Sequence, residues 1–161
     1  WFGSRVVINN KGVGVKVENI LTVKGAEIVK VTTSDSVHKT AKLLREMRIG
    51  AVLVSDDTVD PAGIAGIISE RDIIGGLAVH GAAALDMSVD TMMTRDVHVC
   101  GPSDTVDDVM SMMTDKRIRH LPVMENNELV GLISIGDVVK NKIAESEEEA
   151  RALRDYITTA G

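Results

Sequence analysis

Two short stretches of the 161-residue chain decide its fold. Residues 66–72 are Gly-Ile-Ile-Ser-Glu-Arg-Asp, and residues 131–137 are Gly-Leu-Ile-Ser-Ile-Gly-Asp. In both stretches two large aliphatic residues lie between a glycine and a serine, and an aspartate follows three positions after the serine. This pattern predicts a buried strand that ends at the serine, where a helix begins. Because the pattern occurs twice, it predicts that the chain is a tandem repeat.

The repeat extends to the residues that precede these stretches. Residues 34–37 are Ser-Asp-Ser-Val and residues 103–106 are Ser-Asp-Thr-Val, an offset of 69 residues, whereas the later stretches match at an offset of 65. The difference predicts an insertion of four residues in the first repeat, within residues 56–62. That segment contains three aspartates and a proline, which is typical of a surface turn that tolerates insertions.

Each repeat is predicted to contain a strand, an amphipathic helix, two more strands and a second helix. The fold class is therefore α+β, with two tandem β-α-β-β-α units packed with pseudo-two-fold symmetry around a shared core. Ser36 is the predicted N-cap of the first helix, and Thr105 with Asp108 forms a predicted capping box in the second repeat. The predicted strands are residues 28–31, 51–54 and 63–68, and residues 97–100, 121–124 and 129–133.

After Asp137 the chain is predicted to continue as a long helix. Its apolar residues, Val139, Ile143, Ala150, Leu153 and Ile157, form a stripe at helical spacing. The stripe could pack on its own domain or on a second copy of the chain, and the sequence leaves both open. The predicted organisation is an N-terminal segment 1–20 without a functional signal, repeat one 21–80, a linker 81–90, repeat two 91–142 and a C-terminal helical extension 143–161.

Composition argues against several classes of partner. The chain has 18 Lys and Arg against 24 Asp and Glu, so a net charge of −6 offers no basic footprint for nucleic acid. The longest stretch without a charged residue, 73–85, is too short to span a bilayer. A single cysteine, Cys100, cannot form an intramolecular disulfide, which fits a cytoplasmic location. We therefore expect neither nucleic acid nor a membrane as a partner.

Catalytic motifs are absent from the sequence. The four histidines are scattered, without the spacing of a metal site, and neither a Gly-x-Ser-x-Gly elbow nor a phosphate-binding glycine loop occurs. We expect no enzyme activity and no metal site.

The doubled Ser-x-x-Asp has two interpretations. Ser69 and Ser134 begin helices, where free N–H groups and the helix dipole favour an anion, and the oxygens of Asp72 and Asp137 could accept from the two hydroxyls of a ribose. The same residues could simply form capping boxes that need no ligand. Their spacing alone leaves both open.

Three motifs resemble the tandem cystathionine-β-synthase (CBS) domain pair, also called the Bateman module. They are Thr-Arg-Asp-Val at 94–97, Arg-His-Leu-Pro-Val at 119–123, and residues 131–139, of which residues 66–73 are the first copy. The resemblance covers residues 21–142. It implies a pseudo-two-fold module whose clefts bind adenosyl compounds such as AMP, ADP, ATP, S-adenosylmethionine or NAD(H).

The resemblance also implies roles for single residues. Asp72 and Asp137 resemble the ribose-binding aspartates of the family, and Ser69 and Ser134 resemble its phosphate-side hydroxyls. In repeat two, Thr94 and Val97 of the first motif would border the adenine. Leu121 and Pro122 of the second motif would line its pocket.

The two sites are not expected to be equivalent. Arg119 and His120 would supply cationic donors for a phosphate in repeat two. Gly50 and Ala51 replace them in repeat one, although Arg71 lies in the first turn of the following helix. We expect AMP in repeat two, and in repeat one either no ligand or part of a larger one such as NAD(H), with ATP a further candidate.

The sequence thus favours an adenosyl-nucleotide sensor in a homodimer, in which the ligand changes the packing of the repeats and an unknown downstream protein responds to the change. Two alternatives stay open. One is a dimerisation or interaction module without a ligand, and the other is a regulatory fragment of a larger enzyme or transporter.

Overall fold

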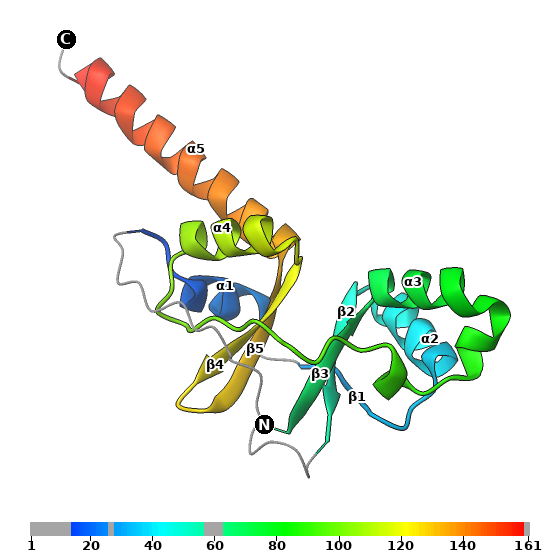
Figure 1. The fold of residues 1–161 in the computed structure, drawn as a ribbon. Coiled ribbons are helices and arrows are strands. Elements are labelled where there is room, and N and C mark those ends of the chain that lie inside the picture. Colours follow the sequence, from blue (N-terminus) through cyan, green and yellow to red (C-terminus); the bar gives the residue numbers. More distant parts are fainter. Residues whose placement is uncertain (1–13, 26–27, 57–62, 160–161) are drawn as a thin grey trace. The chain divides into compact units, whose positions relative to one another are not determined.

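The computed structural model describes residues 14–25, 28–56 and 63–159 as a mixed α and β protein (Figure 1). None of the helices within these ranges is long and apolar enough to cross a membrane. In chain order the elements are α1 (Val17–Lys24), β1 (Lys30–Thr32), α2 (Val37–Met47), β2 (Ala51–Ser55), β3 (Ile64–Ser69), α3 (Glu70–His80), the 3₁₀-helices η1 (Gly81–Asp86) and η2 (Val89–Thr91), α4 (Val106–Lys116), β4 (His120–Glu125), β5 (Glu128–Ser134) and α5 (Ile135–Thr159).

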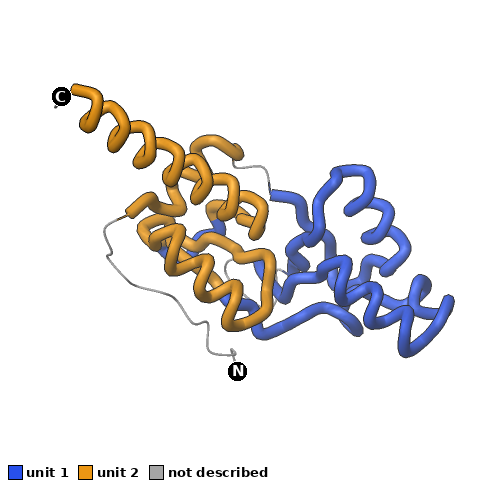
Figure 2. Tube along the Cα trace, turned by 90° about the horizontal axis from the view of Figure 1, so that it is seen from above, with its two compact units in different colours: residues 1–5, 27–98, 126–129 blue, residues 6–26, 99–125, 130–161 orange. Residues whose placement is uncertain are grey.

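The chain forms two compact units, each with its own hydrophobic core (Figure 2). Among the described residues, unit 1 holds 28–56, 63–98 and 126–129, and unit 2 holds 14–25, 99–125 and 130–159. In unit 1, β2 pairs in parallel with β1 and antiparallel with β3, so β2 is the central strand. All four residues 51–54 of β2 are at most 2% exposed, as expected for a strand covered on both faces.

Strands β4 and β5 pair with each other and are joined by a tight turn; β4 and residues 130–134 of β5 belong to unit 2. Asn126 and Asn127 have φ angles of 50° and 64°, the left-handed conformation that two-residue hairpin turns require and asparagine tolerates. The sequence also predicted a strand at residues 97–100, and this prediction was wrong. Val99 and Cys100 each form an isolated bridge, that of Cys100 in parallel with Val123 of β4, so the predicted strand is reduced to bridges at these two residues.

Helices α2 and α4 occupy equivalent places in the two repeats and have the same kind of cap at each end. The predicted caps are confirmed, because Ser36 Oγ accepts from the backbone N–H of Lys39 and Thr105 Oγ1 accepts from that of Asp108. Each helix ends on an arginine in the left-handed conformation, Arg48 with a φ of 55° and Arg117 with a φ of 54°. The repeat therefore extends to the backbone conformation of single residues.

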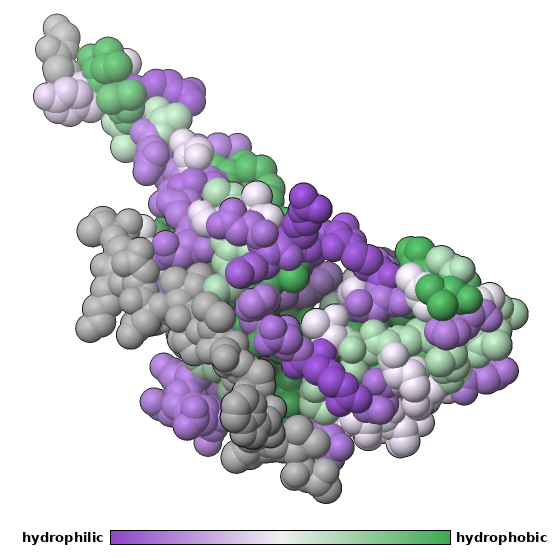
Figure 3. All heavy atoms as spheres, in the orientation of Figure 1, coloured by the Kyte–Doolittle hydropathy of each residue, from purple (hydrophilic) through white to green (hydrophobic). Residues whose placement is uncertain are grey.

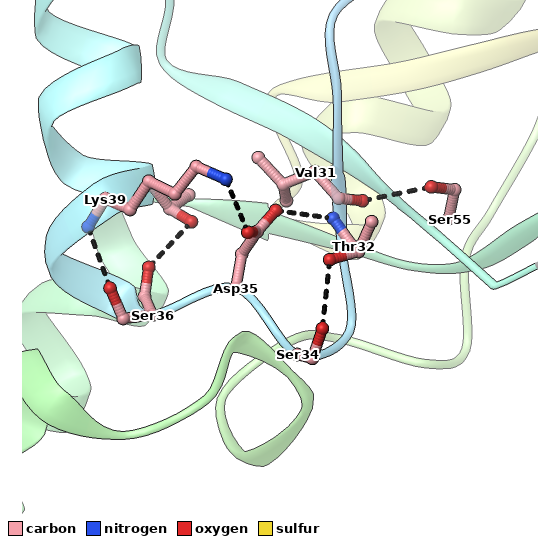
Figure 4. A network of polar contacts seen from close by, with 8 residues as sticks. Val31, Thr32, Ser34, Asp35, Ser36, Lys39 and Ser55 are labelled. Carbon is pink, nitrogen blue, oxygen red and sulfur yellow. Dashed lines mark hydrogen bonds and ion pairs between the residues drawn. The ribbon is translucent and has the colours of Figure 1, made fainter.

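The turn before each of these helices is tied by an aspartate. Asp35 accepts from the backbone N–H of Thr32 at 2.9 Å and from Lys39 Nζ at 2.7 Å (Figure 4). In repeat two, Asp104 accepts from the backbone N–H of Gly101 at 2.7 Å. The hydrogen bond from Lys39 lowers the pKa of Asp35, whereas burial raises the pKa of Asp104. The same kind of turn thus contains an aspartate in both repeats, but the pKa of Asp35 is lowered and that of Asp104 is raised.

Each unit also contains the segment that precedes the other repeat. In unit 2, the backbone N–H of Val17 donates to the carbonyl of Asp104, and that of Val106 donates to the carbonyl of Val15, both at 2.9 Å. In unit 1, the N–H of Val89 donates to the carbonyl of Asp35, and that of Val37 donates to the carbonyl of Met87. We call residues 14–25 and 81–98 the leading segments. They are exchanged between the repeats, so α1 packs with α5 while η1 packs with α2 and α3.

This exchange was not predicted from the sequence. Helix α1 begins at Val17, within the N-terminal segment 1–20, where no functional signal was recognised in the sequence. The predicted linker 81–90 covers all of η1 but only part of η2. The second helix of each repeat and the long C-terminal helix do begin where the doubled motif indicated, at Glu70 and Ile135.

The contact between a leading segment and β3 leaves no room for a side chain at Gly66. A Cβ there would lie 2.7 Å from the carbonyl oxygen of Thr94. We expect Gly66→Ala to lower the free energy of unfolding by about 1–3 kcal/mol, because a backbone atom must move. At Gly75, in α3, a Cβ would meet no atom within 4 Å, so Gly75→Ala should instead stabilise by about 0.5–1 kcal/mol. Urea denaturation of both variants checks this, and equal effects would contradict it.

Candidate functional site

The doubled Ser-x-x-Asp forms two capping boxes of nearly identical geometry. In repeat two, Asp137 Oδ2 accepts from the backbone N–H and the hydroxyl of Ser134, both at 2.8 Å, and Ser134 Oγ accepts from the N–H of Asp137 at 3.3 Å. In repeat one, the corresponding distances between Ser69 and Asp72 are 2.7, 2.7 and 3.4 Å. The capping interpretation of the motif is therefore correct for both repeats, and any ligand contact must be compatible with it.

Repeat two adds a cation to its capping box. Lys24, the last residue of α1, donates from Nζ to Asp137 Oδ2 at 2.6 Å and to the carbonyl oxygen of Leu132 at 3.0 Å. The exchange of leading segments delivers this lysine, because α1 precedes repeat one in the chain but packs in unit 2. The ammonium group thus bridges the last residues of β5 and the first turn of α5.

The backbone of Arg119 and the side chain of His120 lie near the same helix start. The carbonyl oxygen of Arg119 accepts from the backbone N–H of Ile135 at 2.8 Å, which holds the start of β4 beside the start of α5. Burial lowers the pKa of His120, and the positive charges of Arg119 and Lys24 lower it further, while Asp137 opposes them. The lowered pKa keeps His120 mostly neutral at pH 7, and the charges of both Lys24 and Asp137 act on its imidazole.

The charge state of Asp137 follows from the same contacts. Burial raises its pKa, but hydrogen bonds from Lys24 and Ser134 lower it more, so the net pKa lies below the ordinary value. Around pH 7 the site contains an ionised carboxylate, an ammonium and a mostly neutral imidazole at the N-terminus of a 25-residue helix. Such a group of donors and one acceptor suits a ligand with both hydroxyl groups and negative charge.

The predicted site residues divide between the units. Four of them, Arg119, His120, Ser134 and Asp137, come together in unit 2 as described above. Thr94 belongs to unit 1, where its backbone exchanges two hydrogen bonds with Ile67 of β3, at 2.8 and 3.0 Å. Thr94 and Val97 were expected beside an adenine of repeat two, and the structure places them instead in unit 1, which also contains Ser69 and Asp72 of repeat one.

The two residues expected to line the adenine pocket have other environments. Leu121 is fully buried in the core of unit 2, in the same cluster as Val17 and Ile133. Pro122, also buried, accepts from the backbone N–H of Cys100 through its carbonyl oxygen. Leu121 is thus a core residue, and only Pro122 lies on the opposite face of β4.

Repeat one differs from repeat two in its charged residues. Arg71, expected to help hold a phosphate there, is an exposed residue in the first turn of α3. Asp96 lies in the leading segment at the place that corresponds to Lys24, if Val89 is aligned with Val17. In this alignment an acidic residue corresponds to Lys24.

Lys24 contacts the candidate site and was missed by the sequence analysis. The signal that could have found it is a second internal match, of residues 17–22 with residues 89–94 at an offset of 72. That match identifies both leading segments as part of the repeat.

Comparison with known proteins now gives the family. A sequence model described as the CBS domain matches residues 17–79 and 89–143, and each match begins within a leading segment. The chain belongs to the CBS domain family. The CBS domain-containing protein CBSX3, mitochondrial, of Arabidopsis thaliana is 36% identical over 128 residues, which are 78% of this chain and 62% of that protein. The chain therefore spans less than two thirds of this relative's length.

Solved structures of CBS proteins have the same fold. A CBS-domain containing protein from Agrobacterium tumefaciens is 40% identical, with a TM-score of 0.75 over 84% of this chain and 98% of that one. The CBS domain pair of protein MJ0100, 23% identical with a TM-score of 0.69, was solved in complex with 5′-methylthioadenosine and S-adenosyl-L-methionine and covers 81% of this chain and 98% of that one. These likenesses confirm the predicted α+β fold with two tandem CBS repeats and a C-terminal helix.

The Lys24–Asp137 contact predicts a pH-dependent contribution to stability. Asp137→Asn should lower the free energy of unfolding by about 0.5–2 kcal/mol at pH 7, because a charged cap is lost. A carboxyl whose pKa is depressed by folding contributes stability above its unfolded pKa and loses that contribution as the pH falls through its folded pKa. The deficit of the variant should therefore shrink below about pH 4.

Urea denaturation at pH 7 and pH 3 measures this difference. Glu128→Gln, which neutralises an exposed carboxylate in β5, is the control and should change stability little at either pH. A deficit of Asp137→Asn that is the same at both values would show that the ionised form contributes nothing.

Proposed function

We propose that this CBS domain pair is a regulatory module that binds an adenosyl nucleotide at the N-terminus of α5. The observation that carries the proposal is the convergence of Asp137 and Ser134 with Lys24, Arg119 and His120 in unit 2. The carboxylate suits the two ribose hydroxyls, and the helix N-terminus and basic side chains suit a phosphate. The MJ0100 pair, whose structure contains two adenosyl compounds, supports the adenosyl part of the ligand.

Charge favours AMP over S-adenosylmethionine as the ligand of repeat two. A ribose that donates to Asp137 competes with Lys24 for the same carboxylate, so the ammonium group needs another anion when the ligand binds. A phosphate supplies that anion, whereas a sulfonium places a second positive charge beside Lys24 and Arg119. The phosphates of ATP could make the same contact with the Lys24 ammonium group, and they carry more negative charge than the phosphate of AMP.

Repeat one is proposed to be empty or to hold part of a larger ligand such as NAD(H). Ser69 and Asp72 form the same capping box there, with Thr94 bonded to β3 through its backbone. The basic set of repeat two is replaced, since Gly50 and Asp96 stand at the corresponding places. This favours a neutral nucleoside part over a phosphate.

Signalling would follow from a shift between two packing arrangements of the repeats, in a homodimer that a downstream protein recognises. Such a shift requires that the nucleotide prefer one arrangement.

We propose no catalytic step for this chain. We place it in a reducing compartment such as the cytoplasm, because its one cysteine, Cys100, is a buried free thiol whose pKa burial raises to about 12.

Asp137→Ala tests the ribose contact. It should weaken the binding of AMP and of adenosine alike, by roughly 1–3 kcal/mol, because an ionised acceptor is lost. Asp108→Ala is the matched control, since Asp108 also belongs to a capping motif in unit 2 but lies at the start of α4. Titration calorimetry with both compounds measures the difference.

Two outcomes would contradict the ribose contact. Equal affinity of Asp137→Ala and the unchanged chain would leave Asp137 as a cap alone. Absence of heat with any adenosyl compound, together with an absorbance maximum near 280 nm rather than about 260 nm after purification, would favour a dimerisation module without a ligand.

Lys24→Met tests the phosphate contact separately. We expect AMP to bind about tenfold more weakly, because one charge-assisted hydrogen bond disappears, while adenosine binds at least as well, because its competitor for Asp137 is gone. Lys16→Met is the control, since Lys16 lies in the same leading segment and forms an ion pair with the exposed Glu18, at 4.0 Å. Equal weakening of AMP and adenosine would contradict a phosphate role for Lys24.

A further inference from the structure

The second half of α5 stays exposed among the described residues of unit 2. Residues 146–159 are exposed at every position, and α5 extends beyond α4 (Figure 1). Leu153 is 62% exposed, Tyr156 73% and Ile157 64%. Isolated helices of about 12–15 residues are only marginally stable in water, and most helical stability comes from the packing of an apolar face. This half of the helix therefore lacks the contacts that normally stabilise it.

The exposed face of α5 follows a heptad pattern. Val139, Ser146 and Leu153 are at d positions, and Ile143, Ala150 and Ile157 are at a positions, with alternating spacings of four and three residues. Green apolar side chains alternate with purple polar ones along this helix (Figure 3). A seam of this spacing faces a partner helix that has the same spacing.

We infer that α5 pairs with α5 of a second copy as a parallel two-stranded coiled coil. Charge complementarity selects this partner and this direction. In a parallel pair, a g residue of one helix faces the e residue five positions later in the other. Glu149 then faces Arg154 of the second copy, and the symmetry of the dimer provides this contact twice. Lys142 and Glu147 form the equivalent pair one heptad earlier.

The antiparallel alternative places like charges together. Aligning the six core positions in opposite directions brings Glu147 close to Glu147 of the second copy, and Glu149 close to Glu149 of the second copy. It also brings Lys140 close to Arg154 of the second copy. Like charges at these flanking positions destabilise a coiled coil.

The two parallel charge pairs are not equally available. Lys142 Nζ already contacts Asp107 at 2.9 Å and Glu145 at 2.8 Å in its own chain. Glu149 and Arg154 lie in the exposed half of α5, and the pair between them is the better test of the inference. The inference concerns the homodimer and does not depend on nucleotide binding.

Sedimentation equilibrium of the full chain tests the seam. Leu153→Glu with Ile157→Glu should raise the dissociation constant of the dimer by about tenfold or more, because four carboxylates enter an apolar seam. Ala152→Glu with Thr158→Glu adds the same charge outside the seam and is the control, with a change of less than about threefold expected. Equal effects of the two double variants would overturn the inference.

Charge exchange tests the direction. Arg154→Glu alone should raise the dissociation constant by about threefold to fivefold, and adding Glu149→Arg should restore it. In an antiparallel pair, Arg154→Glu would instead strengthen association, since it would face Lys140.

Disulfide cross-linking tests directly whether the two α5 helices pair and in which direction they run. Leu153→Cys should cross-link to itself under mild oxidation, because equivalent d positions are adjacent in a parallel pair. The native Cys100 is buried and does not compete. Failure of this cross-link, or its appearance only in a mixture with an Ile143→Cys variant, would overturn the parallel arrangement.

Discussion

Backbone hydrogen bonds to the exchanged leading segments are the constraint on which the rest of the structure depends. The N–H of Val17 donates to Asp104, and the N–H of Val89 donates to Asp35, at equivalent places in the two repeats. Because the partner groups belong to the backbone, side-chain substitutions elsewhere leave them in place. They bring α1 to the start of α5 and Thr94 to the end of β3, and so decide which residues can share a site.

The capping boxes show how one set of residues can be structural in both repeats and still produce different sites. Ser69 with Asp72 and Ser134 with Asp137 satisfy the first N–H groups of their helices in the same way. The difference arises from the residues around them. Lys24, from the leading segment 14–25, donates a charged hydrogen bond to Asp137, whereas Asp96 is the residue that aligns with Lys24 in the other leading segment.

Much of the fold could be predicted from local patterns. Capping residues and apolar spacing placed α2, α4 and both helices that follow the doubled motif, because these signals act within a few residues. The exchange of leading segments could not be predicted that way, since it depends on hydrogen bonds between distant segments. For the same reason Thr94 was assigned to repeat two, Lys24 was missed and Leu121 was taken as pocket-lining. The strand at 97–100 failed because its pairing is reduced to isolated bridges at Val99 and Cys100.

The exchanged segments also affect how the chain folds during synthesis. Val17 leaves the ribosome long before Asp104, its hydrogen-bond partner, has been made. Until then α1 lacks its partners in the core of unit 2, and contacts between distant segments form late and slowly. Unit 1, apart from residues 126–129, is complete in sequence at residue 98. Most of its contacts can therefore form while the partners of α1 in unit 2 are still being synthesised.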